Sequence, residues 1–494
     1  MSLKSALSEF GIEFLNIDTI LQTALKNGGD FAELFFEKTA STRVVFEAGR
    51  VDRVMDGIDG GVGLRIIFNG RSVYGYTTDL TEPSLLSLAA SLSEGVRGGK
   101  AANSRPNSNS KKPRGKIDWQ LARQSNSTIA HYQVKISPRT ASLAQKIDLV
   151  KRADKAARTA LPDAAQVTAV VLDSDRRILV LNSDGLIAPD RKTYFQMMVQ
   201  VVGAKEGRVE TAYETDGGYV GMEFLNEVSP EDIAKAAAIR VGILLSAKPA
   251  PSGTMPVVLS ADAGGTMIHE AVGHGLEADL ACNGLSVYQG KLGQSVASPL
   301  ITVLDDGTLP GKRGSYSFDD EGTPSQKNTL IEGGVLKSYM VDKLSAMKFD
   351  LMATGNGRRE SFRHKPIVRM TNTYIAPGKD DPRAILESTP WGIFVKAMGG
   401  GQVNTVTGDF VFAVTEGYLI REGKLSEPIR GATLVGNGPQ VLSIVDRVGN
   451  DLGFSTGTCG KDGQGAPVTD AQPTLRIPEL TVGGEVAINS YWNK

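Results

Sequence analysis

The stretch IHEAVGHGLE, residues 268–277, carries the side chains best suited to hydrolytic chemistry. His269 and His274 are metal ligands by type, because zinc binds neutral imidazoles readily. Glu270 directly follows the first histidine and is placed to act as a general base. The pattern follows the logic of the zinc-hydrolase motif H-E-x-x-H, with one more residue between the two histidines.

The extra residue has a structural consequence. On a regular α-helix, positions i and i+5 diverge by about 140°, so both imidazoles cannot face one ion. A widened, π-like turn would bring them together, and Gly273 and Gly275 already weaken a regular helix here. The alternative is an ordinary helix with two unrelated histidines, although the apolar neighbours Met267 and Val272 favour a buried segment whose polar groups need partners.

A catalytic zinc site usually has three protein ligands and an open position. Candidates for the third ligand are Glu277, Asp279, Cys282 and Cys459, and spacing alone does not choose among them. Cys459 lies in TGTCGK, which we interpret as a glycine-flanked loop with a nearby cation, where a thiolate forms more easily.

Other polar groups give weaker signals. His364 belongs to a basic segment that is typical of a solvated loop, and Asp319, Asp320 and Glu321 are typical of an acidic turn more than of a second metal site. Gly399–Gly401 lacks the lysine pattern of a phosphate loop, so no organic cofactor is predicted.

Length, charge and cysteine content limit the classes of protein to which the chain can belong. The chain has 494 residues, which suggests two to four domains, and a net charge of −1, which gives no electrostatic footprint for nucleic acid. Two cysteines exclude a disulfide framework and fit a reducing compartment. Neither a secretion signal nor a membrane-spanning run is evident, so we expect a cytoplasmic protein.

Residues 1–245 are expected to form an α+β domain with an antiparallel sheet. Helical spacing predicts helices over 3–26, 82–96, 142–159 and 229–245, with Ser229 and Pro230 as a start signal for the last. Strands are predicted over 31–38, 41–46, 61–68, 72–77, 167–181 and 193–204, with Asn69-Gly70 as a hairpin turn. Residues 98–116, rich in Gly, Ser, Asn and Lys, predict an exposed loop.

Residues 246–494 are expected to form a second, mostly β domain that carries the metal-binding helix. The Pro-rich segment SAKPAPSGTMP, residues 246–256, marks the boundary. Beyond it, short strand-like runs alternate with glycine-rich turns, and only 266–279 and 341–349 have helical character. The predicted fold class is therefore α+β.

Several of these segments together resemble the TldD/PmbA family of zinc proteases. The resemblance rests on IHEAVGHGLEAD (268–279), FDDEGTPSQKNTLIEGGVLKSYM (318–340), VRMTNTYIAPG (368–378), STGTCGKDGQG (455–465) and GGVGLRIIFNGRSVYGYTTD (60–79). It implies that His269, His274 and Cys459 are the metal ligands and that Glu270 is catalytic. It also implies a dimer, either of identical subunits or with an inactive PmbA/TldE-type paralogue that lacks the metal motif.

These observations lead to the hypothesis of a zinc-dependent peptidase with one Zn²⁺ per active subunit. Glu270 would activate a metal-bound water, and unfolded or extended peptides would be the substrates, with neither nucleic acid nor membrane as a partner. Three alternatives stay open: a non-catalytic peptide-binding subunit of a protease complex, a metal-dependent amidohydrolase acting on a non-peptide, and a structural zinc site closed by a fourth ligand such as Cys282.

Overall fold

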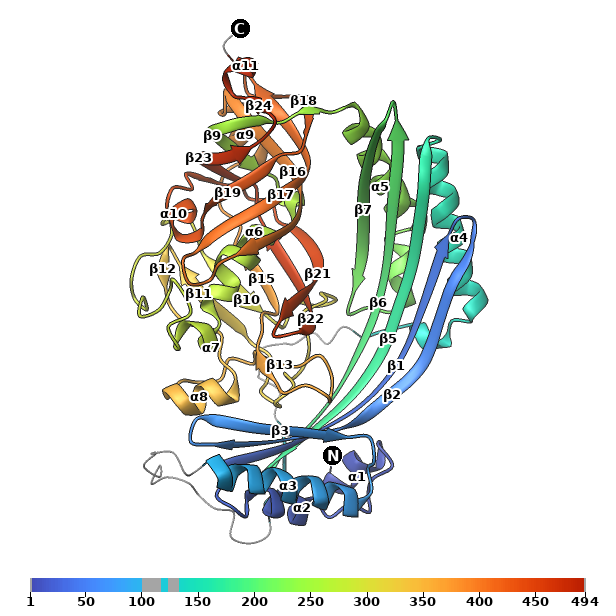
Figure 1. Ribbon diagram of the computed structural model, residues 1–494, viewed down its shortest axis with the longest axis vertical. Helices are drawn as coiled ribbons and strands as arrows, with labels where there is room; N and C mark the ends of the chain where they lie inside the picture. Colours follow the sequence, from blue (N-terminus) through green and yellow to red (C-terminus); the bar gives the residue numbers. More distant parts are fainter. Residues whose placement is uncertain (1, 100–116, 123–132, 493–494) are drawn as a thin grey trace.

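The computed structural model describes residues 2–99, 117–122 and 133–492, which form two halves standing side by side (Figure 1). The predicted loop 98–116 lies almost entirely outside the described residues, as does His131. The first half contains the helices α1 (Leu3–Ser8), α2 (Ile17–Leu25), α3 (Glu82–Gly99), α4 (Leu143–Ala160) and α5 (Pro230–Ser246). Its strands are β1 (Phe31–Glu47), β2 (Arg50–Phe68), β3 (Arg71–Thr77), β4 (Gln120–Leu121), β5 (Ala164–Asn182), β6 (Leu186–Lys205) and β7 (Arg208–Gly218).

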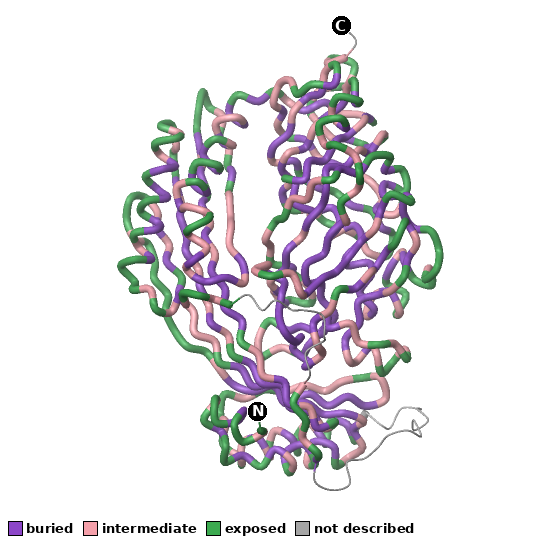
Figure 2. The backbone as a smooth tube through the Cα atoms, turned by 180° about the vertical axis from the view of Figure 1, so that it is seen from behind, coloured by how far each residue is buried: buried purple, intermediate pink, exposed green. Residues whose placement is uncertain are grey.

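These strands form one curved seven-stranded sheet in the order β3-β2-β1-β5-β6-β4, with β7 paired to β6. The main strands are antiparallel, as expected. Helices α4 and α5 cover the outer face of its upper part, and α1–α3 close its base (Figure 1). Buried residues follow the strands of this sheet down to the place where it meets the second half, which also contains many buried residues (Figure 2).

Local signals explain several of these elements. Ser229 caps α5 through the Asp232 amide, and Asn69 and Gly70 both have positive φ angles in the β2–β3 turn, as predicted. The prediction of a single helix over 3–26 is wrong. The helix is interrupted around Gly11, whose φ is +69°, and Asn16 caps a second helix. Strand β7 was not predicted.

The second half consists of two larger sheets and a two-stranded ribbon. The nine-stranded sheet contains β8 (Lys248–Pro249), β9 (Pro251–Leu259), β16 (Trp391–Val403), β17 (Asp409–Arg421), β18 (Lys424–Arg430), β19 (Thr433–Asn437), β20 (Arg447–Val448), β23 (Leu475–Gly483) and β24 (Val486–Ala487). The six-stranded sheet contains β10 (Val303–Asp306), β11 (Lys327–Glu332), β12 (Val335–Leu336), β15 (Asn372–Ile375), β21 (Gly453–Lys461) and β22 (Gln464–Gln472). The ribbon is β13 (Gly357–Arg358) with β14 (Ile367–Val368).

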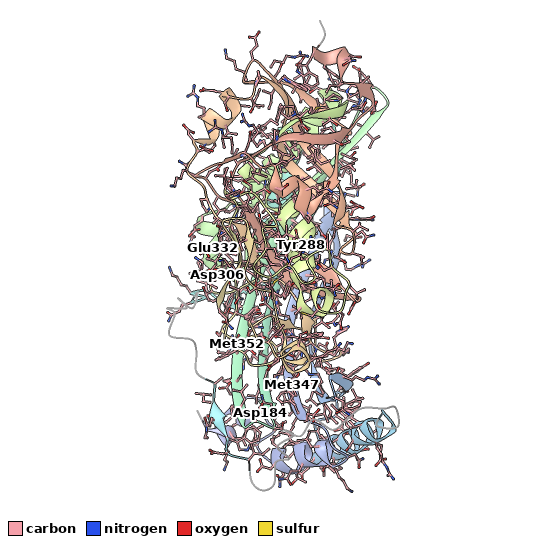
Figure 3. All side chains as sticks on the ribbon, turned by 90° about the vertical axis from the view of Figure 1, so that its left-hand side faces the viewer. Asp184, Tyr288, Asp306, Glu332, Met347 and Met352 are labelled. Atoms are coloured by element: carbon pink, nitrogen blue, oxygen red, sulfur yellow. The ribbon has the colours of Figure 1, made fainter. Side chains whose placement is uncertain are left out.

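Helices are few and short in this half, which fits the predicted mostly β character. They include α8 (Lys343–Phe349), α9 (Pro382–Glu387), α10 (Gly438–Ser443), α11 (Asn489–Trp492) and the irregular segment that begins with α6 (Thr266–Ile268). The side view in Figure 3 places Asp184, from the first half, near the base and Tyr288, from the second half, well above it.

A buried group of charged side chains joins the two halves near the base. We call it the ionic junction; it consists of Glu33, Arg65, Lys192, Asp320, Glu321 and Arg359. Each of these side chains is at most 3% exposed, and the oppositely charged atoms lie 2.5–3.0 Å apart. Asp320 and Glu321 are therefore paired with basic side chains in the interior, where the sequence had indicated an acidic turn.

Candidate metal centre

The histidine motif lies on a helical segment that changes its winding twice. After α6, residues His269–Gly273 form a π-helical turn, labelled η4, and His274–Leu276 form the 3₁₀ turn η5, followed by α7 (Ala278–Ala281). The widened turn is the one that the i, i+5 spacing required. It brings the two imidazole rings to a centroid distance of 5.1 Å, at an interplanar angle of 88°.

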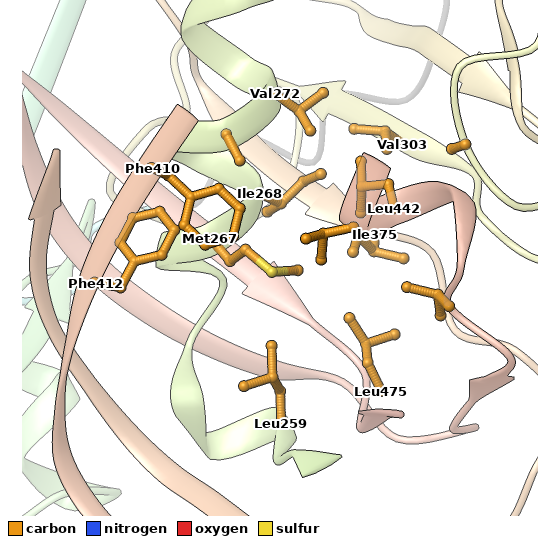
Figure 4. Packing of buried hydrophobic residues seen from close by; sticks show 14 of the residues in the cluster. Leu259, Met267, Ile268, Val272, Val303, Ile375, Phe410, Phe412, Leu442 and Leu475 are labelled. Atoms are coloured by element: carbon orange, nitrogen blue, oxygen red, sulfur yellow. The ribbon is translucent and has the colours of Figure 1, made fainter. Parts of the chain in front are cut away.

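Apolar packing holds this segment in the core of the second half. Figure 4 shows Met267, Ile268 and Val272 among side chains of both sheets, including Leu259, Phe410, Phe412, Val303 and Ile375. A glycine is needed where the segment begins, because a Cβ at Gly265 would lie 2.5 Å from the Ala471 nitrogen. The start of the segment is thus pressed directly against β22.

Cys459 approaches the histidines from β21, an edge strand, and not from the loop expected there. Its Sγ lies 3.2 Å from His269 Nε2 and 3.4 Å from His274 Nε2, and the three donor atoms all lie within 4.8 Å of one another. Ligand atoms around a tetrahedral zinc would be separated by about 3.3–3.6 Å, given bond lengths of about 2.0–2.3 Å. The donor types suit a zinc ion, and the two sulfur–nitrogen distances match this spacing.

The other candidates for the third ligand lie elsewhere. Among the described residues, the group that could hold a metal contains only the two histidines and Cys459. Glu277 is fully buried behind His274, and Asp279 pairs with Lys461 at 2.7 Å, so neither forms a solvated helix end. Cys282 is half-buried and free. His364 lies near Ser361, with its Nδ1 3.0 Å from the hydroxyl oxygen, and does not join the group.

Two carboxylates orient the imidazole rings from behind. His269 Nδ1 lies 2.7 Å from Asp470 Oδ1, and His274 Nδ1 lies 3.0 Å from Glu277 Oε2. A carboxylate on Nδ1 fixes the ring and leaves Nε2 for a metal, an arrangement common at zinc-binding histidines. Lys461 holds Glu277 in turn, at 3.0 Å. The sequence analysis missed Asp470 because its surroundings, PVTDAQ, carry no local signal.

Without a metal, the pKa values of the three donor side chains are all shifted from their usual values. Burial raises the pKa of the Cys459 thiol, but the two histidines outweigh this and lower it to about 4. Burial likewise opposes protonation of His274, yet Glu277 and Cys459 raise its pKa to about 10. The pKa of His269 is also raised, by Asp470 and Cys459 against the effect of burial.

Glu270 differs from the other acidic groups of the site. It is half-buried, and within the described part of the chain no side chain or amide hydrogen-bonds to its carboxylate. Burial raises its pKa above the usual value, while the neighbouring histidines lower it. A carboxylate held without a partner beside a metal site is available to accept a proton.

A cavity of about 600 Å³ lies between the two halves. It is lined on one side by β7, from Thr211 to Gly217, and on the other by Phe454, Ser455 and Thr456 of β21. Both strands are edge strands of their sheets. The backbone of the ligand-bearing strand therefore borders an open space between two sheet edges.

Comparisons with known proteins agree with this architecture. Residues 252–484 match the family model "PmbA/TldA metallopeptidase C-terminal domain", residues 136–245 match the central domain, and residues 32–96 match domain 1. The chain is 37% identical to a Haemophilus influenzae protein named "Metalloprotease TldD homolog", covering 92% of this chain and 93% of that protein. It is 36% identical to the homolog of Buchnera aphidicola subsp. Schizaphis graminum, covering 98% and 99%.

Solved structures show the same fold at low sequence identity. TldE from Thermococcus kodakarensis superposes with a TM-score of 0.72 at 20% identity, covering 95% of this chain and all of that one. A Thermotoga maritima protein described as a modulator of a DNA gyrase gives a TM-score of 0.73 at 21% identity, covering 94% and 99%. None of the helices in the described residues has the length and apolarity needed to cross a membrane.

Proposed function

The chain belongs to the PmbA/TldD metallopeptidase family, and we propose that it is a zinc-dependent peptidase of the active, TldD type. In this proposal His269, His274 and Cys459 bind the ion, and Glu270 is the general base. The observation that carries it is the convergence of three donor atoms beside the carboxylate of Glu270, to which no described residue hydrogen-bonds. A bound zinc would supply Lewis-acid chemistry, making a water more acidic and polarising a peptide carbonyl.

The protein's own groups account for the proton transfers. Glu270 accepts a proton from the attacking water and returns it to the leaving amine, a sequence that its raised pKa favours. Asp470 and Glu277 keep the Nδ1 atoms of the two histidines occupied, so that Nε2 keeps its direction throughout.

The substrate class follows from the cavity. An extended peptide can pair with a free sheet edge through its main chain, which gives affinity with little sequence preference. The cavity between β7 and β21 offers two such edges next to the strand that carries Cys459. We therefore propose unfolded or extended peptides as substrates.

Two features bear on the alternatives. A closed structural zinc site needs a fourth protein ligand, and among the described residues the donor group has three members, without Cys282. A non-catalytic subunit has no use for the complete His-Glu-His set. The likeness to TldE supports a dimer, with an identical subunit or a paralogue, as part of the same proposal.

The test is Glu270→Ala, assayed for zinc content and for cleavage of casein and short peptides. We expect the variant to keep its zinc and lose activity by about 100-fold or more, the usual scale for a proton-transfer group. Glu332→Ala, at an exposed glutamate (Figure 3), is the control and should match the unmodified protein. Simultaneous loss of zinc would make Glu270 a ligand, and hydrolysis of only non-peptide amides would favour an amidohydrolase.

A further inference from the structure

Three buried arginines surround the hairpin formed by β21 and β22. Arg313, Arg358 and Arg369 are 8%, 3% and 0% exposed, and within the described residues none forms an ion pair with a carboxylate. Each donates instead to a backbone carbonyl of the hairpin: that of Gly457, Pro467 or Cys459. Burying a charge without a counter-charge is costly, so these contacts call for a specific role.

Arg369 is the one that contacts the proposed ligand itself. Its Nη2 donates to the carbonyl oxygen of Cys459, and its Nη1 donates to that of Gln464 at 3.0 Å, so one guanidinium bridges both strands near the hairpin turn. The backbone of Arg369 is fixed as well, because its amide donates to Asn356 O at 2.9 Å and its carbonyl accepts from Asn356 Nδ2 at 3.0 Å.

Met370, the next residue, contacts the helical segment that carries the histidines. Met370 packs on the π-helical turn so closely that a Cβ added at Gly273 would lie 2.0 Å from its sulfur. Gly273 immediately precedes His274. The dipeptide Arg369–Met370 therefore contacts both the strand that carries Cys459 and the helical segment that carries the two histidines.

We propose that Arg369, with Met370, positions Cys459 relative to His269 and His274, and so sets the metal affinity of the centre. The hairpin needs such a brace, because β21 pairs with no other described strand on its outer side. Metal–ligand distances must be met to about 0.2 Å, so a small shift of Cys459 weakens binding. Arg369 is thus a positioning residue, and the inference rests on the metal centre proposed above.

The test is titration of the metal-free protein with Co²⁺, followed through thiolate-to-cobalt absorption. Arg369→Lys keeps the charge but cannot reach both carbonyls; we expect affinity to fall about 10–100-fold, with a weaker absorption band. Arg313→Lys is the matched control, since Arg313 is also buried and donates to the same hairpin; the Co²⁺ affinity of this variant should stay within about threefold of that of the unmodified protein. Equal affinities for the two variants would overturn the proposal.

A second pair of variants covers the case in which Arg369→Lys does not fold. Met370→Ala removes the side chain that packs on the π-helical turn and should weaken Co²⁺ binding, whereas Met352→Ala, at an exposed methionine, should leave it unchanged. Equal Co²⁺ affinities for these two variants would count against the brace. Absence of the thiolate band in the unmodified protein would instead refute the metal centre, so the two failures are distinguishable.

Discussion

The ionic junction and the proposed metal centre are both buried clusters of polar side chains, yet they are organised in opposite ways. In the junction, charges close on one another: Arg65 pairs with Glu33 at 2.9 Å and with Glu321 at 2.6 Å, and Lys192 pairs with Asp320 at 3.0 Å. In the metal centre, the carboxylates lie on the outside and the three donor atoms converge on one point.

The comparison shows what separates a structural charge cluster from a chemical one. The junction joins strands of the first half to loops of the second, and its acidic oxygens have basic partners. In the proposed centre, no described residue hydrogen-bonds to the Glu270 carboxylate, and two Nε2 atoms and one sulfur point inward. Burial and charge are common to both clusters, whereas convergence of donor atoms is the feature on which the proposed metal centre rests.

The largest effect that would sharpen this contrast is expected from Cys459→Ala. Loss of one of three ligands should reduce zinc affinity by more than about 100-fold and abolish peptidase activity. This loss of affinity is larger than the one typical of residues that only orient a ligand. Metal analysis after dialysis against a weak chelator measures this. Full zinc occupancy in the variant would remove Cys459 from the centre.

Arg359→Met tests the ionic junction. Removing the guanidinium leaves the buried carboxylate of Glu33 to Arg65 alone, and we expect a loss of about 3 kcal/mol of unfolding free energy with zinc content unchanged. Urea denaturation measures the first quantity. Arg363→Met, at an exposed pair with Asp59, should cost less than about 1 kcal/mol. If zinc were lost from a folded Arg359→Met protein, the two clusters would not be separable.

Asp470→Asn should have an intermediate effect on the metal centre. The amide keeps an oxygen for His269 Nδ1 but removes the negative charge, and such changes typically cost about 10–100-fold in metal affinity. Competition with a chromogenic chelator gives the value. Wild-type affinity would show that the carboxylate does not tune the histidine.

The smallest expected effect concerns protons released on metal binding. The raised pKa values of both histidines and the lowered pKa of Cys459, about 4, favour two imidazolium groups and a thiolate in the metal-free site at pH 7. Binding should then release about two protons per ion, so that metal affinity rises with pH. An indicator dye in weak buffer counts the protons. Release of one proton would mean that the three donor side chains together hold a single releasable proton, and not two.

The sequence predicted the parts of the site that depend on local spacing. The i, i+5 separation of His269 and His274 required a widened turn, and η4 provides it. The mostly β second half followed from short apolar runs between glycines. The assignment of Cys459, however, came from resemblance, since nothing in the spacing of residues 190 positions apart indicates contact.

What the sequence could not show depends on tertiary contacts. Asp470 acts on His269 only because β22 lies beside α6, and Arg369 matters only because β14 ends next to the hairpin. The acidic residues Asp320 and Glu321 resemble a surface turn until strands from the first half supply Lys192 and Arg65. Such pairings have no periodicity to detect.

A sulfur donor also gives the centre a redox liability. Cys459 is 4% exposed, and in the metal-free site its thiolate form is the species that peroxide attacks. Oxidation to sulfenic acid would remove one ligand, and further oxidation would make that removal permanent. A bound ion would therefore protect the sulfur, so that loss of metal and oxidative damage reinforce each other.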